Sequence, residues 1–516
     1  MAGRDVLAVL PTGAGKSAIY QVPALLVDGP TLVISPLLAL QRDQVQGLDA
    51  SRAPEAVAVN SAQRADERRH AWDALREGDA EYLFLSPEQL AKDEVLEDLA
   101  PLGVRLLVID EAHCVSAWGH DFRPDYLRLG TVIERLGHPR TLALTATAGL
   151  PVRRDIVERL GLQEPAEVIA SFDRPNLHLA VERVDDDRRK RSAVVSRVAT
   201  LMSGPATGRG LVYVASRKEA EYYADELGQI GLRAAAYHAG MKSADRQRVH
   251  HQFLADDLDV VVATSAFGMG IDKPDVRFVV HASAPESLDS YYQQIGRAGR
   301  DGQPAEITLF YRPEDLRLQT FLTASRAPED ALRDVAEALG DRDEPMRAAE
   351  LADYVDGPAG RRTRAVNLLE QAGAVGTTED GRLEYLDPDT DPEQAVSAAV
   401  EVSETHQRLL RSRIEMMRGY AEATGCRRQF LLGYFGEQLP HACGNCDSCD
   451  AGTAQDHPTD GTPFPVNTAV WHSRWGHGVV MAVEPDRLTV LFDSDGYKTL
   501  ATAAVQSQGL LTTDPA

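Results

Sequence analysis

The stretch LPTGAGKS at residues 10–17 decides the fold, because it joins an apolar run at residues 6–10 to a helical pattern. A strand, a glycine-rich loop and a helix in that order are typical of an α/β unit whose loop wraps phosphate. Glycines let backbone N–H groups approach the phosphates, while Lys16 supplies charge to the β and γ groups and the Ser17 hydroxyl can ligate magnesium. The usual pattern starts with glycine, where this chain has Leu10. The residues expected to bind a nucleotide here are Thr12, Gly13, Ala14, Gly15, Lys16 and Ser17.

The alternation of strand and helix continues well beyond this loop. Further β-branched runs are each followed by a polar or glycine-rich break and a helical pattern, which predicts parallel α/β architecture. These runs lie at residues 31–35, 82–86, 106–110, 141–145, 211–215, 260–263, 278–281 and 307–311. We therefore expect two α/β lobes that meet near residues 168–176.

Two adjacent acids end the apolar run at residues 106–110. An Asp-Glu pair at a strand end is usually a solvated turn, but this pair follows a phosphate loop and a buried strand. We expect Asp110 to hold magnesium through water and Glu111 to orient and deprotonate the water that attacks the terminal phosphate. Both are candidate catalytic residues, together with Lys16.

The second lobe contains QQIGRAGR at residues 293–300. Its arginines, Arg297 and Arg300, are spaced to reach across a cleft and neutralise charge that develops on the γ-phosphate. A basic surface helix is the alternative, but it would not require the small glycines that bring a backbone close to a partner. We expect both arginines to be catalytic and Gln293 to contact the nucleotide.

An aromatic segment, SAWGHDFRPDY at residues 116–126, follows the acid pair closely. Trp118 and Phe122 offer faces on which nucleic-acid bases can stack, a contact worth about 1–3 kcal/mol per base. Arg123 offers a phosphate or cation–π contact. Aromatic residues at such spacing more often belong to a core, but the flanking Gly, Asp, Arg and Pro favour an exposed loop that binds DNA.

Four of the five cysteines crowd together near the C-terminal end of the chain. Cys426, Cys443, Cys446 and Cys449 are separated by 16, 2 and 2 residues. Four thiolates suit tetrahedral zinc, and an iron–sulfur cluster is the remote alternative. We expect a structural zinc site with no open coordination position, and a purely structural role for Cys114.

The region after residue 326 changes character. Helical patterns at residues 346–355 and 361–372 and a hairpin at 375–386 follow the order of a winged helix, whose basic residues would contact DNA. A plain helical connector is the alternative. Residues 466–511 alternate apolar and polar positions, which predicts a small β-barrel. The winged-helix residues expected to contact DNA are Arg361, Arg362 and Arg364.

Composition and charge limit the classes of protein that fit. The 516 residues are 43% hydrophobic and 26% charged, which excludes wholesale disorder, collagen and coiled coil. No apolar run is long enough to span a bilayer, so we expect a cytoplasmic protein. The net charge of −24 argues against general attraction to nucleic acid. DNA should instead follow a local basic track, with binding that weakens steeply with salt.

These motifs, in this order, resemble superfamily 2 helicases and more narrowly the RecQ family of DNA helicases, over roughly residues 3–325 and 405–450. Among the segments that carry the resemblance are DEAHC at 110–114, TATA at 145–148, FDRPNL at 172–177 and ATSAFGMGIDK at 263–273. The tail resembles the SH3-like or Tudor-like barrel of UvrD-type helicases.

The resemblance implies an ATP-dependent DNA helicase that uses ATP, Mg²⁺ and Zn²⁺ and moves 3′ to 5′ on single-stranded DNA in repair and recombination. It implies single-stranded and forked DNA as partners, and a protein partner at the barrel. The alternatives are a nucleic-acid-binding scaffold and a translocase that does not unwind. The expected units are RecA-like lobes at 1–167 and 168–326, a winged-helix-like segment at 327–395, a zinc-binding helical module at 396–450, a linker at 451–465 and a barrel at 466–516.

The chain departs from the family's pattern in two places. Relatives carry, ahead of the phosphate loop, a glutamine that reads adenine and an aromatic residue that stacks on it, but only 15 residues precede Lys16 here. We expect the natural start to lie upstream of Met1; the alternative is nucleotide binding without base selectivity. The winged-helix-like stretch also precedes the zinc module, and nothing resembling an HRDC domain follows.

Overall fold

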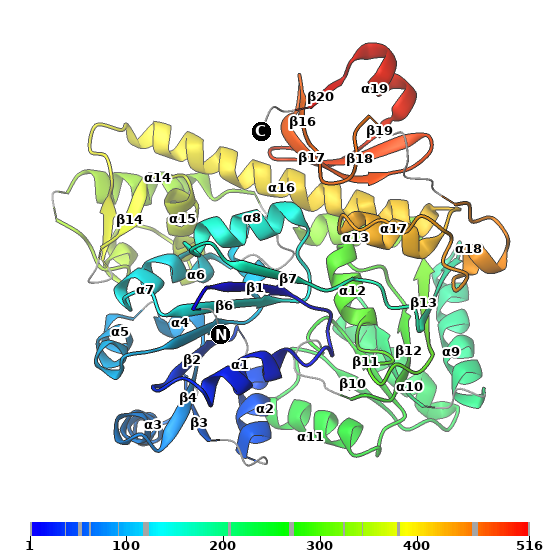
Figure 1. Ribbon diagram of the computed structural model, residues 1–516, viewed down its shortest axis with the longest axis horizontal. Helices are drawn as coiled ribbons and strands as arrows, with labels where there is room; N and C mark the ends of the chain where they lie inside the picture. The colour runs from blue at the N-terminus through cyan, green and yellow to red at the C-terminus, as the bar shows by residue number, and fades with distance from the viewer. Residues whose placement is uncertain are drawn as a thin grey trace.

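The computed structural model describes residues 3–36, 38–49, 54–60, 63–90, 92–116, 123–204, 208–267, 273–323, 326–342, 344–378, 382–456 and 463–513. Two α/β lobes lie side by side, a long helix crosses above both, and a small β-barrel sits on that helix (Figure 1). Within these residues no helix is both long and apolar enough to cross a bilayer.

The first lobe is a seven-stranded sheet in the order β3-β4-β2-β5-β6-β1-β7, and all its strand pairs are parallel. Strands β1, β2 and β5 are short apolar runs, buried because helices cover both faces of the sheet. The strands are β1 (Val6–Val9), β2 (Thr31–Ile34), β3 (Glu55–Val59), β4 (Ala80–Leu85), β5 (Leu106–Ile109), β6 (Arg140–Thr145) and β7 (Ala166–Ile169). The helices are α1 (Lys16–Ala24), α2 (Leu38–Asp49), α3 (Ala65–Glu77), α4 (Pro87–Leu90), α5 (Asp93–Leu99), η1 (Ala100–Leu102), η2 (Ala112–Val115), α6 (Pro124–Leu127), α7 (Leu129–Arg135) and α8 (Leu150–Arg159).

The second lobe is a six-stranded parallel sheet in the order β10-β11-β9-β12-β13-β8. Its strands are β8 (Leu177–Arg183), β9 (Arg209–Tyr213), β10 (Ala234–Tyr237), β11 (Val260–Ala263), β12 (Val276–His281) and β13 (Ala305–Tyr311). Its helices are α9 (Asp187–Ser203), α10 (Arg217–Gln229), α11 (Ser243–Leu254), α12 (Leu288–Ile295) and α13 (Pro313–Thr323). Both lobes therefore have the RecA-like architecture that the sequence predicts.

Four strands lie outside the predicted runs, and they share one property. Strands β3 and β7 are the two edges of the first sheet, and β10 and β8 are the two edges of the second. An edge strand is covered less completely than a central one, so its sequence needs no continuous apolar run. Strand β7 is almost wholly exposed and β10 reads AAAY. Apolar runs alone therefore find the centre of each sheet and miss its margins.

A winged-helix-like unit follows the second lobe. Helix α14 (Glu329–Gly340), the 3-10 turn η3 (Glu350–Asp353) and α15 (Ala359–Gln371) precede a hairpin of β14 (Val375–Thr377) and β15 (Leu383–Tyr385). The helix predicted over residues 346–355 is wrong except at η3. Met346 instead exchanges both backbone hydrogen bonds with Leu383, at 2.8 and 2.7 Å, so its N–H and C=O extend the hairpin sheet rather than a helix.

Helix α16 (Pro392–Glu422) runs for 31 residues across both lobes and crosses the expected boundary at residues 395/396 without a break (Figure 1). Two short helices, α17 (Arg427–Tyr434) and α18 (Asp447–Asp450), complete the module that carries the cysteine cluster. The C-terminal unit, which we call the barrel after the predicted fold, is a five-stranded antiparallel sheet in the order β19-β18-β17-β16-β20. It consists of β16 (Ala469–His472), β17 (Gly476–Val483), β18 (Arg487–Phe492), β19 (Gly496–Ala501), α19 (Thr502–Gln508) and β20 (Leu511–Thr513).

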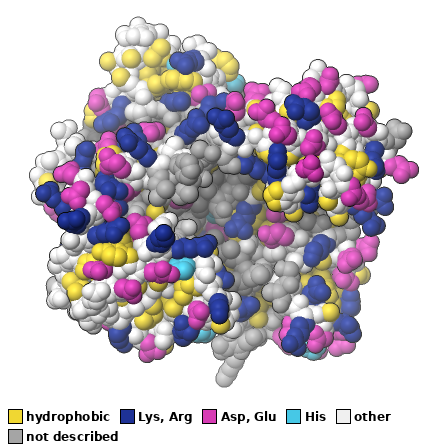
Figure 2. All heavy atoms as spheres, turned by 180° about the vertical axis from the view of Figure 1, so that it is seen from behind, with side chains coloured by type: hydrophobic (Ala, Val, Ile, Leu, Met, Phe, Trp, Pro, Cys, Tyr) yellow, Lys and Arg dark blue, Asp and Glu magenta, His cyan; other side chains and the backbone are white. Residues whose placement is uncertain are grey.

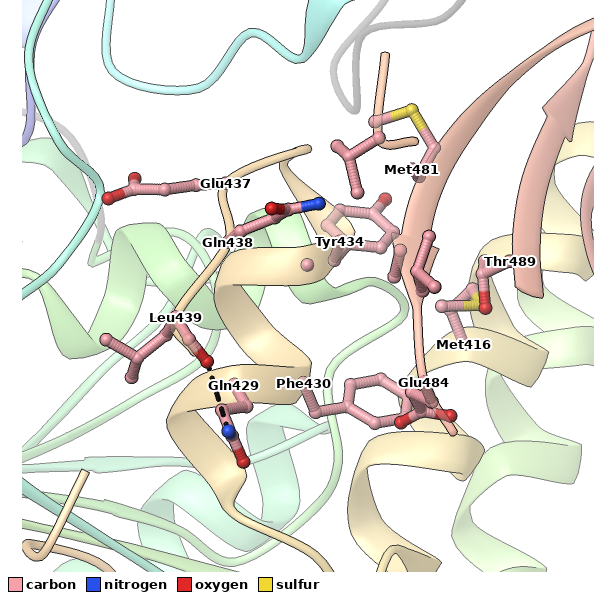
Figure 3. Close-up of a pocket in the computed structure, with 14 residues that line it drawn as sticks. Met416, Gln429, Phe430, Tyr434, Glu437, Gln438, Leu439, Met481, Glu484 and Thr489 are labelled. Carbon is pink, nitrogen blue, oxygen red and sulfur yellow. Dashed lines mark hydrogen bonds between the residues drawn. The ribbon is translucent and has the colours of Figure 1, made fainter. Parts of the chain in front are cut away.

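The barrel packs against its neighbours through one face of β17 and β18. Val480 and Val490 point into the barrel's own core, whereas Val479, Met481 and Leu491 pack on Leu409 of α16. The Tyr497 ring stacks on Tyr434 of α17, with ring centroids 4.8 Å apart. A small pocket remains between α17 and β17 (Figure 3). Figure 3 labels among its lining residues Met416, Phe430, Tyr434, Met481, Glu484 and Thr489.

Candidate nucleotide site between the two lobes

The phosphate loop lies between β1 and α1, at the carboxyl edge of the first sheet. Gly13 and Gly15 have φ of 84° and 75°, in the left-handed region that side chains with a Cβ disfavour. Gly15 is the N-cap of α1, so Lys16 and Ser17 occupy the first turn of a helix whose N–H groups point toward the loop. The sequence LPTGAGKS therefore forms the anion-binding geometry of a helix N-terminus.

The acid pair lies at the end of β5, within the same sheet as the loop. Asp110 is 7% exposed, accepts from the Glu111 backbone N–H at 2.9 Å, and its own carbonyl accepts from the Tyr126 hydroxyl at 3.0 Å. Burial and the neighbouring Glu111 charge raise the pKa of Asp110, while Lys16 and a bond from Gln44 oppose that shift. Because burial disfavours its charged form, this carboxylate would be stabilised by a divalent cation, which is what a magnesium site requires.

Glu111 adopts a backbone conformation that is uncommon for a residue with a side chain. Its φ of 50° and ψ of 44° lie in the left-handed region, at a cost of about 1–3 kcal/mol. Its carboxylate lies 3.3 Å from Nδ1 of His113, and that nitrogen lies 2.9 Å from the Thr145 hydroxyl at the end of β6. His113 and Thr145 were not predicted as site residues. Both belong to segments of the family resemblance, which was the available signal for finding them.

The turn after α12 carries both predicted arginines and rests on the phosphate loop. The Thr12 hydroxyl donates to the Gly296 carbonyl at 3.1 Å. A Cβ on Gly296 would lie 2.2 Å from that hydroxyl oxygen, and a Cβ on Gly13 would lie 3.0 Å from Cγ of Arg300. The glycines at these two positions therefore permit the contact between the lobes. We call residues 296–300 the arginine turn.

The residues present fit a nucleotide with its magnesium ion. Arg297 is 5% exposed and bonds to the Tyr213 hydroxyl; burial raises the pKa of Tyr213, and the charge of Arg297 opposes the rise. Two buried donors, Nε of Arg297 and Nε2 of Gln293, have no hydrogen-bond partner among the described residues. Unpaired buried donors are groups that an anionic ligand would satisfy, and these two lie on or next to the arginine turn, whose Gly296 accepts from Thr12 of the phosphate loop.

The four predicted cysteine ligands form one cluster. Their sulfur atoms all lie within 4.8 Å of one another, with Cys443 and Cys449 3.8 Å apart and Cys446 and Cys449 3.4 Å apart. Tetrahedral zinc with bonds of about 2.3 Å to sulfur requires separations near 3.8 Å. Thiol hydrogen bonds from Cys426 and Cys443 lower the pKa of Cys446, which favours a thiolate there. The cluster fits a structural zinc ion.

The structure describes only some of the residues predicted to contact DNA. Trp118 and Phe122 lie outside the described residues. Arg123 closes the base of the aromatic segment, because its side chain donates to the Pro36 carbonyl at 3.1 Å and its backbone N–H to Cys114 at 2.9 Å. Figure 2 shows Lys and Arg side chains around a hollow in the middle of the face opposite to Figure 1, while acidic side chains are spread over the rest of that surface.

The three arginines of α15 do not form one basic face. Arg361 lies 3.4 Å from the carboxylate of Asp330, and Arg362 donates to the Gly357 carbonyl at 2.7 Å. Arg364 lies near α16, where its charge adds to burial and to Arg413 in lowering the pKa of His406 to about 4. Arg361 and Arg362 thus have partners near the start of α15, while the charge of Arg364 acts on His406 of α16.

Family models match three parts of the chain. They are described as DEAD/DEAH box helicase at residues 1–156, helicase conserved C-terminal domain at 193–302 and RecQ zinc-binding at 389–450. Two RecA-like lobes with a phosphate loop, an acid pair and an arginine turn define the class as superfamily 2 helicases. Within that class the chain belongs to the RecQ family, as its relatives show.

Two curated relatives illustrate the family. The chain is 38% identical to a probable ATP-dependent DNA helicase RecS of Bacillus subtilis, covering 87% of this chain and 86% of that protein. It is 36% identical to the ATP-dependent DNA helicase RecQ of Haemophilus influenzae, over 87% of this chain but 59% of that protein. Among solved structures, the DUF1998 helicase MrfA bound to DNA shares the fold with a TM-score of 0.52 and 18% identity, over 76% of this chain and 56% of that one.

Proposed function

We propose that this chain is an ATP-dependent DNA helicase of RecQ type that steps along single-stranded DNA as its two lobes close and open. The observation that carries the proposal is the arginine turn of the second lobe resting on the phosphate loop of the first. A nucleotide bound at the phosphate loop would therefore lie against both lobes, as an enzyme that links two lobes through its nucleotide requires. The names of the curated relatives, which are DNA helicases, support the same substrate.

Each lobe supplies a different set of the residues needed for ATP hydrolysis. Lys16 and Ser17 would hold the phosphates and the magnesium ion, and Asp110 would help to hold the ion. Glu111 orients and deprotonates the attacking water, with His113 holding its carboxylate. From the other side, Arg297 and Arg300 stabilise the charge that develops on the γ-phosphate. The zinc ion, held by the four cysteines, supplies structural support.

The direction and setting follow from the family and are part of the proposal. Movement 3′ to 5′ and a role in DNA repair and recombination are consistent with membership of the RecQ family, and a cytoplasmic location completes the proposal. The division into two lobes, a winged-helix-like segment, a zinc module and a barrel is part of the proposal, with α16 continuous from the winged-helix-like segment into the zinc module. The aromatic segment and the start of α15 are the proposed DNA contacts, and the barrel is the proposed site for a protein partner.

The test is ATP hydrolysis with and without single-stranded DNA, combined with unwinding of forked duplexes that carry a 3′ or a 5′ tail. We expect hydrolysis stimulated by DNA and unwinding from the 3′ tail. Lys16→Ala should abolish both activities, whereas Lys218→Ala, which removes an exposed lysine of α10, should leave them unchanged. Binding of DNA without stimulated hydrolysis would favour the scaffold, and hydrolysis without strand separation would favour a non-unwinding translocase.

A further inference from the structure

The segment between the two sheets does more than connect the lobes. Residues 170–176 leave β7 of the first lobe and enter β8 of the second. On one side the segment contacts the arginine turn, and on the other it contacts the zinc module. We call residues 171–177 the interlobe segment.

The side chain of Arg174 is bonded to the backbone of the arginine turn. Its guanidinium donates to the carbonyls of Ala298 at 2.9 Å, Gly299 at 3.0 Å and Gly296 at 3.4 Å. These three carbonyls flank Arg297 and precede Arg300. A planar guanidinium can span several acceptors at once, which a lysine ammonium on a flexible stem cannot reproduce. One side chain therefore fixes the curvature of the turn that faces the phosphate loop.

Asn176 strengthens the same attachment. Its Nδ2 donates to the carbonyls of Gly299 and Gln303, both at 2.9 Å. Gly299 has a φ of 58°, and a Cβ there would lie 2.4 Å from that Nδ2 atom. The glycine of the turn is thus required both for its backbone conformation and for the approach of the interlobe segment.

The zinc module holds the opposite side of the interlobe segment. Arg428 of α17 donates to the carbonyls of Leu177 at 2.6 Å and Arg174 at 3.2 Å, and Asn445 donates to Pro175 at 2.9 Å. Figure 3 shows Glu437 pointing away from the barrel strand. There its carboxylate accepts from the Ser171 hydroxyl at 2.5 Å and the Phe172 backbone N–H at 2.7 Å.

We propose that Arg174 is a positioning residue for ATP hydrolysis, which acts by holding the arginine turn so that Arg297 and Arg300 meet the phosphate loop. Arg174 touches neither the phosphate loop nor the acid pair, so its effect passes through the two arginines. Because the interlobe segment is fastened to the zinc module, the turn keeps its alignment relative to that module. The inference rests on the proposed function, since it concerns the same hydrolysis.

A double-mutant cycle separates this role from general support of the fold. The variants are Arg174→Ala, Arg300→Ala and the combination of both, with Arg174→Lys as the conservative change. Arg197→Ala is the matched control, because Arg197 also bonds within the second lobe, to Thr308 and Glu306, but does not touch the arginine turn. The readouts are kcat and KM for ATP with saturating single-stranded DNA, alongside zinc content.

Arg174→Ala should lower kcat by about 10- to 100-fold, the size expected when reacting groups are misplaced by about an ångström. The KM for ATP should change by less than about threefold, because the phosphate loop is intact. In the Arg300→Ala background the same substitution should lower kcat by a clearly smaller factor than in the unmodified chain, because only Arg297 then remains for it to displace. Arg174→Lys should recover little, and Arg197→Ala should resemble the unmodified chain.

An equal loss of kcat in both backgrounds would overturn the inference, as would a normal kcat for Arg174→Ala. Should Arg174→Ala fail to fold, Asn176→Ala enters the cycle in its place, with a smaller loss of kcat expected and the same criterion. Hydrogen exchange in the nucleotide-free protein gives a readout that does not need activity. Peptides covering residues 293–303 should exchange faster in Arg174→Ala than in Arg197→Ala, and equal exchange would contradict the inference. Absent hydrolysis in the unmodified chain would contradict the proposed function instead.

Discussion

The two halves of the nucleotide site are held in different ways. In the first lobe, Lys16, Asp110 and Glu111 follow β1 and β5, two strands that β6 joins within one sheet. In the second lobe, Arg297 and Arg300 lie on a turn whose carbonyls are bonded to Arg174, more than 120 residues earlier in the chain. The first half is positioned by its own sheet, whereas the second half is positioned by hydrogen bonds from residues outside the arginine turn.

In the proposed mechanism, this difference lets the lobes move while the acid pair keeps its geometry. The acid pair keeps its geometry as long as the first sheet is folded, because its anchors are backbone pairs of adjacent strands. The arginine turn keeps its geometry only while the interlobe segment and zinc module hold it. Closure of the two lobes over the nucleotide therefore depends on the arginine turn, in the second half of the site. The chemical step in the closed state depends on the acid pair, in the first half.

The largest effect should come from the first half of the site. Glu111→Gln removes the group that deprotonates water but keeps the size of the side chain, so kcat should fall by about 10²- to 10⁴-fold. Binding of ATP should persist, because the phosphate loop and Lys16 are unchanged. Initial rates of hydrolysis and equilibrium binding of a fluorescent nucleotide measure the two quantities.

Glu134→Gln is the matched control, since it makes the same chemical change at an exposed position of α7. It should leave kcat unchanged. Should Glu111→Gln hydrolyse ATP at the normal rate, water activation would have to lie elsewhere, and the two halves of the site could no longer be distinguished by role.

The sequence predicts the features that depend on local patterns and misses those that depend on contacts between distant segments. The phosphate loop, the acid pair and the cysteine cluster are local patterns, and the structure brings the residues of each together. The central strands were predicted because parallel sheets bury them on both faces. Edge strands, the β-bridge of Met346 and the proximity of Arg364 to His406 depend on contacts with distant segments, which local periodicity does not encode.

Arg174 shows this limit most clearly. The segment FDRPNL belongs to the family resemblance, yet nothing in its local sequence tells which backbone carbonyls Arg174 will bond to. Its acceptors are carbonyls, which every residue carries, so no pattern of side chains marks them. Thr145 is not predicted for a related reason, because its position beside His113 depends on the pairing of β5 with β6.

Loss of the zinc site should give the next largest effect. It should act only on the second half of the nucleotide site, which carries the arginine turn. Cys446→Ser removes a fully buried ligand whose neighbour in space is the backbone of Leu179 in β8. Zinc content should fall from one per chain to near zero, and the chain should lose several kcal/mol of stability. Cys114→Ser is the matched control, because its sulfur lies outside the cluster and zinc content should stay at one.

At a temperature where the zinc-free chain remains folded, kcat should fall while nucleotide binding at the phosphate loop is retained. Atomic absorption, thermal denaturation and nucleotide titration test these points in turn. Equal weakening of nucleotide binding and kcat would show that the zinc module supports both lobes, and the comparison between the two halves would fail.

A smaller effect should come from the contact between the zinc module and the interlobe segment. Arg428 is 5% exposed, bonds to two carbonyls of that segment and lies 3.3 Å from the Asp173 carboxylate. Arg428→Lys keeps the charge but loses the planar fork, so kcat should fall about three- to tenfold with little change in KM. Arg411→Lys, an exposed change on α16, should have no effect. A changed KM with normal kcat would place Arg428 in nucleotide binding instead.

The smallest effect should be a pH-dependent one at the tie between the zinc module and the second lobe. Bonds to Glu306 and then Asp450 raise the pKa of His178 to about 9, so the folded state binds this proton more tightly than the unfolded chain does. The resulting stability is fully present below the ordinary histidine pKa of about 6.5 and is lost as the pH rises through about 9. His178 is partly open to solvent, which reduces the effect.

His178→Gln should therefore lower the melting temperature by about 2 °C at pH 6.5 and by almost nothing at pH 10. His251→Gln, at an exposed site on α11, should show no such trend. A difference that stays constant from pH 6.5 to 10 would mean that His178 contributes through packing, and that the tie between module and lobe carries no charge.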